Sequence, residues 1–418
     1  MKKTSILFLF TVFCSIQNIQ TYAEMNPFFS QFKTPYKIPP FELIKDEHYK
    51  PAFYRAMESH LNEVDAITSN IDSPSFTNTI IALEKSGKDL DVVSSTFFNL
   101  QSSNTNDIMD EIAAEMGPKL SGHYDAIYLN KELFNRVKSV YNTSSELDLN
   151  TEQLRLISEI YKDFIRSGAQ LNEESMSVLT EINQELSSLT IQFDQNLLKE
   201  TNEGYQLIIS DVEQLDGLPK DIINQAKKLA QSEGHDGQWL FKPTRVSMYP
   251  FLTYSTQRDL RQKLYTSYTK RGNNDNEYDN KAIAINIANL RLKRAKILGY
   301  ASHADFVLDN TMAQTTDRVK DLLDRVWSPG LETAKKEAAE MQKMIEDEGD
   351  TFELAAWDWW YYSEKIRQLK YDFSEEEAKP YFSQAKVLQG AFDVATKLFD
   401  ITFEERFDLP KYRENIRT

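Results

Sequence analysis

The sequence predicts a mostly α-helical protein with one small β-ribbon, and three features of its 418 residues lead to this fold class. Only 13 residues are glycine, whereas ordinary proteins contain about 7%. Leu, Glu, Lys, Ala and Gln, which favour helix over turn-rich β structure, are plentiful. Apolar residues recur at three- and four-residue steps in several segments, which predicts helices with one buried face.

Residues 1–23 have the layout of a secretory signal peptide. Lys2 and Lys3 precede an apolar run from Ile6 to Phe13, and Ala23 closes a stretch of small residues suited to cleavage. The run is shorter than the ~20 apolar residues that span a bilayer, so we expect no transmembrane span. The protein is therefore expected to be exported, to the periplasm or the cell envelope.

The only cysteine, Cys14, lies within this predicted signal. A lipid anchor at Cys14 is the less favoured alternative, because the preceding Phe13 is bulky where a lipidation site has a small residue. Cleavage after Ala23 would leave a mature chain without disulfides and without thiolate ligands for a metal.

Residues 24–52 are predicted to form an extended arm. Proline removes backbone donors and disfavours helix, and the segment is rich in it. The aromatic side chains in the same stretch give the arm a means to pack against the body of the protein. These prolines and aromatics are Pro27, Phe28, Phe29, Phe32, Pro35, Tyr36, Pro39, Pro40 and Phe41.

Two helical regions follow, at 53–257 and 258–418. Within the first, Tyr205–Ile209 and Trp239–Phe241 are β-prone runs on either side of a helical stretch near 221–232, and we expect them to pair as a ribbon at about 205–241. Three apolar stripes are interpreted as core-facing helix surfaces rather than coiled coil. The stripes are Leu179, Ile182, Leu186, Leu189, Phe193 and Leu197; Val319, Leu322, Leu323 and Val326; and Leu388, Phe392, Ala395 and Phe399.

The charge balance argues against a nucleic-acid partner. Asp and Glu number 64 and Lys and Arg 48, for a net charge of −16. Phosphates would be repelled by such a chain unless it carried a strong basic stripe, and the sequence has none.

The sequence offers no convincing metal site. No two of the five histidines lie four residues apart, so no His-Glu-x-x-His helix can be formed. Glu47-His48 and His60 with Glu63 place carboxylates near imidazoles, but we interpret the second pair as a solvated helix face. His123 and Asp125 are interpreted as a helix boundary. We therefore assign no catalytic residue and no metal ligand, and the substrate-binding residues stay unknown.

Other catalytic chemistry also lacks support. The sequence has no Gly-x-Ser-x-Gly turn for a serine nucleophile, no cysteine in the mature chain, and no glycine-rich loop for a nucleotide phosphate.

Two further segments are interpreted as structural. The aromatic run Trp357–Tyr362 could line a ligand site, yet its side chains would point to different faces of a helix, and we favour a buried helix. Asp358 is expected to stabilise the first turn of that helix. Arg271–Asp275 is a turn-rich break between helices.

Several stretches, in matching order and spacing across nearly the whole mature chain, together resemble the thimet oligopeptidase, oligopeptidase A and peptidyl-dipeptidase family of zinc metallopeptidases. The bacterial peptidyl-dipeptidases are the subgroup that looks most similar. The stretches include Asn26-Pro27, Pro39-Pro40-Phe41, His48-Tyr49, Pro51-Ala52-Phe53, Pro118-Lys119-Leu120-Ser121, Leu133-Phe134-Asn135-Arg136-Val137, Tyr161-Lys162-Asp163-Phe164, Ser167-Gly168-Ala169, Arg261-Gln262-Lys263-Leu264-Tyr265, Arg271-Gly272-Asn273, Asp279-Asn280, Leu298-Gly299-Tyr300, Trp357 to Tyr362, and Pro380-Tyr381-Phe382.

This resemblance implies a helical, two-lobed body with a deep channel that admits short peptides. It also implies zinc, which would polarise the scissile carbonyl and lower the pKa of a bound water to ~7. The zinc motif of the family would fall beyond Leu409-Pro410-Lys411-Tyr412, so the metal-bearing part and its ligands are missing from this sequence. No catalytic residue of the family can be placed on any position here.

The resemblance therefore implies the N-terminal portion of a zinc peptidase, inactive by itself, that needs a longer product or a metal-bearing lobe encoded downstream. One alternative is a non-catalytic protein of the cell envelope that binds peptides. Another is a functionless fragment of a split gene.

Overall fold

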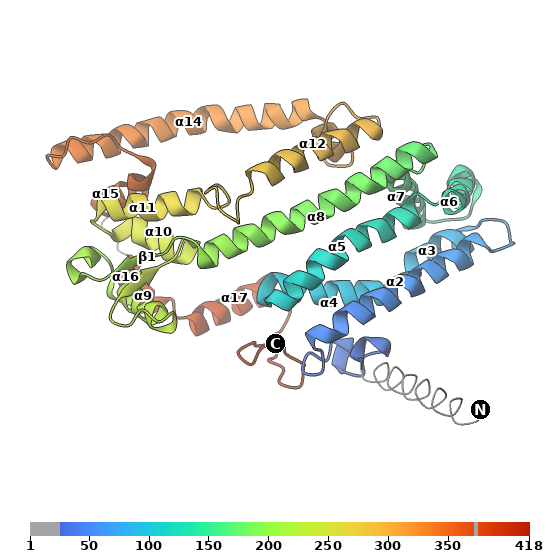
Figure 1. The fold of residues 1–418 in the computed structure, drawn as a ribbon, viewed down its shortest axis with the longest axis horizontal. Helices are drawn as coiled ribbons and strands as arrows, with labels where there is room; N and C mark the ends of the chain where they lie inside the picture. Colours follow the sequence, from blue (N-terminus) through green and yellow to red (C-terminus); the bar gives the residue numbers. More distant parts are fainter. Residues whose placement is uncertain (1–25, 372–374) are drawn as a thin grey trace, which may run out of the picture. The chain divides into compact units, whose positions relative to one another are not determined.

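Helices make up most of the structure, and the predicted fold class is confirmed. The computed structural model describes residues 26–371 and 375–418 (Figure 1). The predicted signal peptide and Cys14 lie outside these residues. The chain divides into two units, the first comprising Met1–Ile191, Leu290–Ala301 and Glu404–Thr418 and the second Gln192–Asn289 and Ser302–Phe403. No helix in the described part is long and apolar enough to cross a membrane.

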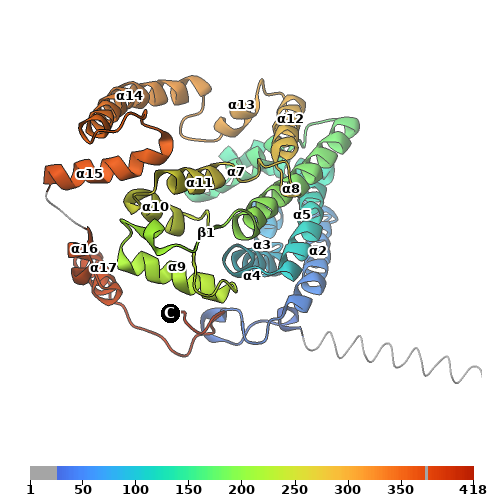
Figure 2. The ribbon, with the colours of Figure 1, turned by 60° about the vertical axis from the view of Figure 1, so that its left-hand side comes forward.

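Unit 1 is built from helices that pack side by side, with α2 against both α4 and α5 (Figures 1 and 2). Three asparagines set helix starts, because Asn106, Asn130 and Asn150 each accept a hydrogen bond from the backbone N–H three residues on. The elements are α2 (Asp46–Thr68), η3 (Phe76–Ile81), α3 (Ala82–Lys85), α4 (Lys88–Asn104), α5 (Asp107–Tyr128), α6 (Lys131–Thr143), η4 (Ser144–Glu146) and α7 (Thr151–Ser167). Helices α8 (Glu173–Glu203) and α12 (Lys281–Ile297) have residues in both units.

The prediction of an extended arm over 24–52 is wrong from Asp46 onward. Short 3-10 turns at η1 (Pro27–Phe29) and η2 (Pro35–Lys37) interrupt the extended part, and α2 already begins at Asp46 with Pro51 inside it. The proline removes one helical hydrogen bond. Burial of Tyr49, Ala52 and Phe53 on the same helix outweighs that loss.

In unit 2 the predicted ribbon is confirmed. Strands β1 (Leu207–Ile209) and β2 (Trp239–Phe241) pair antiparallel, with Ile208 opposite Leu240. The intervening α9 (Lys220–Ser232) packs against β2, and α11 (Arg258–Thr269) contacts β1 (Figure 2). Alternate strand residues face a core that also contains Phe251 and Leu252 of α10 (Arg245–Tyr254).

The rest of unit 2 is helical. Its elements are η5 (Val212–Leu215), α13 (His303–Leu308), α14 (Thr316–Asp347), η6 (Ala356–Asp358), α15 (Trp359–Tyr371), α16 (Glu375–Ala378), η7 (Lys379–Tyr381) and α17 (Gln384–Phe399). The C-terminal end of α14 is anchored, since Met341 and Ile345 are buried with Tyr362 of α15.

The three apolar stripes differ in their burial. Leu179, Ile182 and Leu186 of α8 are buried, as predicted, whereas Leu189, Phe193 and Leu197 of the same stripe are only partly buried. The stripe on α14 is not a core surface, because Leu322, Leu323 and Val326 are 57%, 58% and 65% exposed.

On α17, Leu388, Phe392 and Ala395 are half-buried and Phe399 is 70% exposed. The prediction that these two stripes form core is therefore wrong for the described residues, since periodicity defines an apolar face without supplying the surface that covers it.

Candidate functional site

The nearest approach to a catalytic arrangement in unit 1 is a buried pair of imidazoles. His60 of α2 and His123 of α5 are 8% and 6% exposed. The Nε2 atom of His123 lies 3.0 Å from Nδ1 of His60, and Nε2 of His60 lies 3.2 Å from Ser86 Oγ.

The hydrogen bonds define the protonation of the two rings. The Ser86 hydroxyl donates its single proton to the Leu83 carbonyl, 2.7 Å away, so it accepts from Nε2–H of His60. A neutral His60 then has an acceptor at Nδ1, and His123 donates from Nε2. The pair is thus satisfied with both rings neutral.

Burial lowers the pKa of both rings, and the charge of His60 lowers that of His123 further. Burial lowers the pKa of His60, and the carboxylates of Glu63 and Asp91 oppose that change. For His123, burial and then the charge of His60 lower the pKa to about 4. Such a pair is suited to structure rather than to proton transfer near neutral pH.

Two sequence interpretations are corrected here. The solvated helix face proposed for His60 and Glu63 is wrong: His60 is buried, and the Glu63 carboxylate accepts the N–H of Gly87 at 2.7 Å. The boundary proposed at His123 and Asp125 is also wrong, because both residues lie within α5.

Asp125 lies two residues from the imidazole pair in a different environment. Its carboxylate accepts a hydrogen bond from Asn183 Nδ2 at 2.9 Å, and its second oxygen has no partner within the described structure. Burial raises the pKa of Asp125 to about 6, against the opposing effects of Asn183 and Arg294.

The other predicted carboxylate–imidazole pair, Glu47-His48, marks the start of a helix. The Nδ1 atom of His48 accepts the backbone N–H of Lys45 at 3.1 Å, which satisfies a donor at the N-terminus of α2. The His48 carbonyl accepts a hydrogen bond from Asn26 Nδ2 at 2.9 Å, which fastens the arm to α2.

In unit 2, Asp358 has no exposed surface and is held by two arginines. Arg258 donates from Nε and Nη2, the latter at 2.8 Å, and Arg261 donates from Nη2, also at 2.8 Å. The Ala355 N–H donates to the same carboxylate at 3.1 Å. Asp358 does cap a turn, as expected, but its main role is a buried ion pair joining η6 to α11.

The aromatic run around Asp358 covers these arginines. The guanidinium carbons of Arg258 and Arg261 lie 4.1 Å from the ring centroid of Phe352 and 4.3 Å from that of Tyr361. Trp360 stacks against Tyr249 of α10, with centroids 5.4 Å apart. Only Tyr362 and Asp358 of this run are fully buried, so the prediction of a buried helix holds for part of it.

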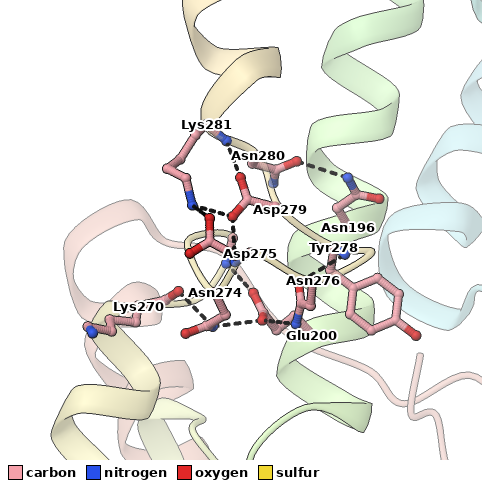
Figure 3. Close-up of polar contacts among 11 residues, drawn as sticks. Asn196, Glu200, Lys270, Asn274, Asp275, Asn276, Tyr278, Asp279, Asn280 and Lys281 are labelled. Atoms are coloured by element: carbon pink, nitrogen blue, oxygen red, sulfur yellow. Dashed lines mark hydrogen bonds and ion pairs between the residues drawn. The ribbon is translucent and has the colours of Figure 1, made fainter.

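A second buried carboxylate, Glu200 of α8, organises the loop between α11 and α12 (Figure 3). Glu200 is 3% exposed and accepts the backbone N–H of Gly272 together with the side-chain amides of Asn274 and Asn276, at 2.7 and 2.8 Å. Gly272 has φ +72°, and an added Cβ would come within 3.2 Å of the Asn280 side chain.

The same loop contains the predicted break at Arg271–Asp275. Lys281 pairs with both Asp275 and Asp279, and Asn196 of α8 donates to Asn280 at 3.0 Å (Figure 3). The cationic Lys281 and the amide donors therefore satisfy the oxygens that a metal ion would need.

These polar centres do not fit zinc. Across residues 26–371 and 375–418, no three His, Cys, Asp or Glu side chains come together in a way that could hold a metal ion. His123 donates to His60 and His60 donates to Ser86, and the two buried carboxylates accept from arginine, amide and backbone donors.

Known proteins match most of this chain. Residues 251–418 match the model of peptidase family M3. The dipeptidyl carboxypeptidases of Escherichia coli and Salmonella typhimurium are 34% and 35% identical to it over 394 and 393 residues, in both cases 94% of this chain and 58% of the relative. Oligopeptidase A of Haemophilus influenzae is 30% identical over 386 residues, 91% of this chain and 56% of its own.

These relatives are all peptidases by name. The chain is therefore similar to peptidase family M3 over residues 251–418 and to dipeptidyl carboxypeptidases and oligopeptidase A over most of its length, in line with the resemblance seen in its sequence. It spans somewhat over half the length of the curated relatives it matches.

We expect Asp358→Asn to destabilise unit 2 by about 3 kcal/mol, because it leaves the buried Arg261 without its counterion. All five tryptophans lie in unit 2, so urea unfolding followed by tryptophan fluorescence reports on this unit. Asp259→Asn is the control: its exposed carboxylate pairs with Lys263 at 3.7 Å and should matter by less than about 1 kcal/mol. Equal effects of the two variants would contradict the assignment.

Unit 1 is expected to lose stability as the pH falls from about 6.5 towards 4. The folded-state pKa of both imidazoles is lowered, so the unfolded chain binds protons first on acidification. The imidazole pair therefore makes its full contribution to the stability of unit 1 above the pKa of an unfolded histidine. This contribution, about 2 kcal/mol, is lost as the pH falls below that value towards the lowered folded-state pKa.

The measurement is urea unfolding followed by circular dichroism at pH 7.5 and 4.5, for the parent chain and His123→Gln. The variant should lose less stability between these pH values, and His235→Gln in unit 2 serves as the control. Asp125, with its raised pKa, acts in the opposite direction but is common to all three proteins, so the difference isolates the imidazole pair. Parallel pH profiles for parent and His123→Gln would refute the mechanism.

Glu200→Ala should destabilise unit 2 by about 2 kcal/mol, since it strands the donors of Gly272, Asn274 and Asn276. The matched control is Glu203→Ala one turn away, where the exposed carboxylate accepts the hydroxyl of Tyr278. Tryptophan fluorescence in urea measures both. An effect of Glu200→Ala no larger than that of the control would show that the loop is held by other contacts.

Proposed function

We propose that this chain is the metal-free portion of an M3 peptidase that hydrolyses short peptides. The proposal rests on two observations taken together, one from the alignment with relatives and one from the structure. The chain aligns over 94% of its length with dipeptidyl carboxypeptidases but spans 58% of theirs, and no described set of side chains fits zinc. By the name of those relatives, the reaction would release dipeptides from the carboxyl end of a peptide.

In this proposal zinc and its ligands come from a second polypeptide, or from a further segment of a longer product. The apolar face of α14 supports the idea of a missing partner surface. Leu322, Leu323, Val326 and Trp327 are between 57% and 68% exposed, and they follow one another at helical spacing. Exposed apolar side chains gathered on one helix face commonly mark a protein–protein interface.

The α17 end of unit 2 supports the same idea. Val387, Val394, Leu398 and Phe399 are all more than half exposed on one short helix. We propose that the metal-bearing polypeptide covers both faces, which would complete the peptidase and shield apolar surface from water.

The proposed location is the cell envelope. The basic, apolar and small-residue order of residues 1–23 supports export, and the mature chain has no cysteine that an oxidising compartment could bridge.

The purified chain alone is expected to show no chelator-sensitive cleavage of short peptides. Co-expression with the part of the Escherichia coli dipeptidyl carboxypeptidase that this chain does not cover should restore cleavage, and removing zinc with a chelator should abolish it. The measurement is release of dipeptides from a short peptide followed by chromatography.

Trp327→Asp should reduce the restored activity at least tenfold by placing a charge in the proposed interface. Lys335→Asp, on a polar exposed position of the same helix, is the matched control. Chelator-sensitive cleavage by the chain alone would overturn the proposal. Restored activity that is insensitive to Trp327→Asp would exclude α14 as the interface.

A further inference from the structure

A hollow of about 470 Å³ lies in unit 1, between the N-terminal arm, α2 and the start of α4. Its apolar side includes Phe28, Phe29 and Phe32 of the arm and Val92 and Val93 of α4. This volume is in the range of pockets that hold small ligands. The hollow is formed by residues of unit 1 alone.

The aromatic side of the hollow is fixed to the core. Phe28 contacts the buried Tyr49 ring, with centroids 5.5 Å apart, and Phe32 lies edge-on to Phe28 at 5.9 Å. Asn26 caps the turn that carries Phe28 and donates to the carbonyl of His48. The arm therefore forms a preorganised side of the hollow, because its aromatic rings are already held in place before an apolar group enters.

Three cations, Lys37, Arg55 and Lys88, line the same hollow, with Asp89 as the one carboxylate. Within residues 26–371 and 375–418, none of the three cations has an ion-pair partner. In a chain with 16 more acidic than basic side chains, three unpaired cations around one hollow favour an anionic ligand.

Arg55 lies over an aromatic ring that lines the hollow. Its guanidinium carbon lies 4.4 Å from the centroid of Phe29, so the ring supports the planar group. Stacking engages the face of a guanidinium and leaves the N–H groups of its edge available for a bidentate contact. Arg55 is also exposed, so a ligand reaches it without unfolding the site.

We propose that this hollow binds small amphipathic carboxylates: an apolar side chain or ring against Phe28, Phe32 and Val92, with its carboxylate on the edge of Arg55. Lys37 and Lys88 raise the local positive potential and outweigh Asp89. The C-terminal residue of a short peptide and a free aromatic acid share this chemistry. The proposal does not depend on the proposed function, because it requires no metal and no second polypeptide.

The experiment is isothermal titration of the full chain with three probes: N-acetyl-phenylalanine, its amide N-acetyl-phenylalaninamide, and 3-phenylpropionate. The amide has the same ring and no charge. We expect N-acetyl-phenylalanine to bind at least tenfold more tightly than the amide, which corresponds to about 1.4 kcal/mol for a charge-assisted contact. Binding of 3-phenylpropionate as well would extend the site to free acids, whereas its failure would restrict the site to carboxylates of peptide form.

Arg55→Gln should remove the preference for the carboxylate over the amide, and Arg55→Lys should keep only part of it because the fork is lost. The matched control is Arg155→Gln on α7, an exposed arginine of unit 1 far from the hollow in sequence. Circular dichroism checks that each variant is folded. Equal affinity for acid and amide, or an unchanged preference in Arg55→Gln, would overturn the proposal.

Discussion

The buried carboxylate of Asp358 is the constraint on which the centre of unit 2 depends. An anion removed from water persists only where donors surround it, and here two arginines and a backbone N–H do so. Arg258 and Asp358 are 100 residues apart in sequence, so the ion pair fixes α11 against η6 and the start of α15. An apolar trio of equal volume could stabilise the unit as well, but it would not define which helix faces which.

Glu200 is also a buried carboxylate surrounded by hydrogen-bond donors, but none of the described donors is a cation. Backbone and amide donors from a single loop converge on it, so the loop between α11 and α12 takes the shape that satisfies one carboxylate. The imidazole pair in unit 1 is the neutral counterpart: His60 and His123 are satisfied by each other and by Ser86. In each case a buried polar group selects one arrangement of neighbouring segments, because any other leaves it unpaired.

Local patterns in the sequence were sufficient to predict helices and strands, but not which buried polar side chains contact one another. Stripe spacing located α8, β-prone runs located the ribbon, and asparagine caps agree with helix starts. The partner of His60 lies 63 residues away on another helix, and no spacing rule connects the two. Proximity in sequence instead suggested Glu63, which turned out to hold the Gly87 backbone. The sequence did not predict the contacts of His60, Asp358 and Glu200 for the same reason, because each of them depends on how helices pack.

The apolar stripes of α14 and α17, which were wrongly predicted to be buried, carry the most information about function. Apolar residues at helical spacing are expected to be buried, and Leu179, Ile182 and Leu186 of α8 are. On α14 and α17 the same pattern meets water within the described structure, although nothing in their composition distinguishes them. Exposed apolar area is unfavourable in proportion to its extent, and this is the physical reason for our proposal that a further protein surface covers these two faces. The alignment covers 58% of the dipeptidyl carboxypeptidases, and the part of them that it leaves uncovered is a source for the proposed surface. The exposed faces of unit 2 thereby support the proposed division of the peptidase between two polypeptide segments.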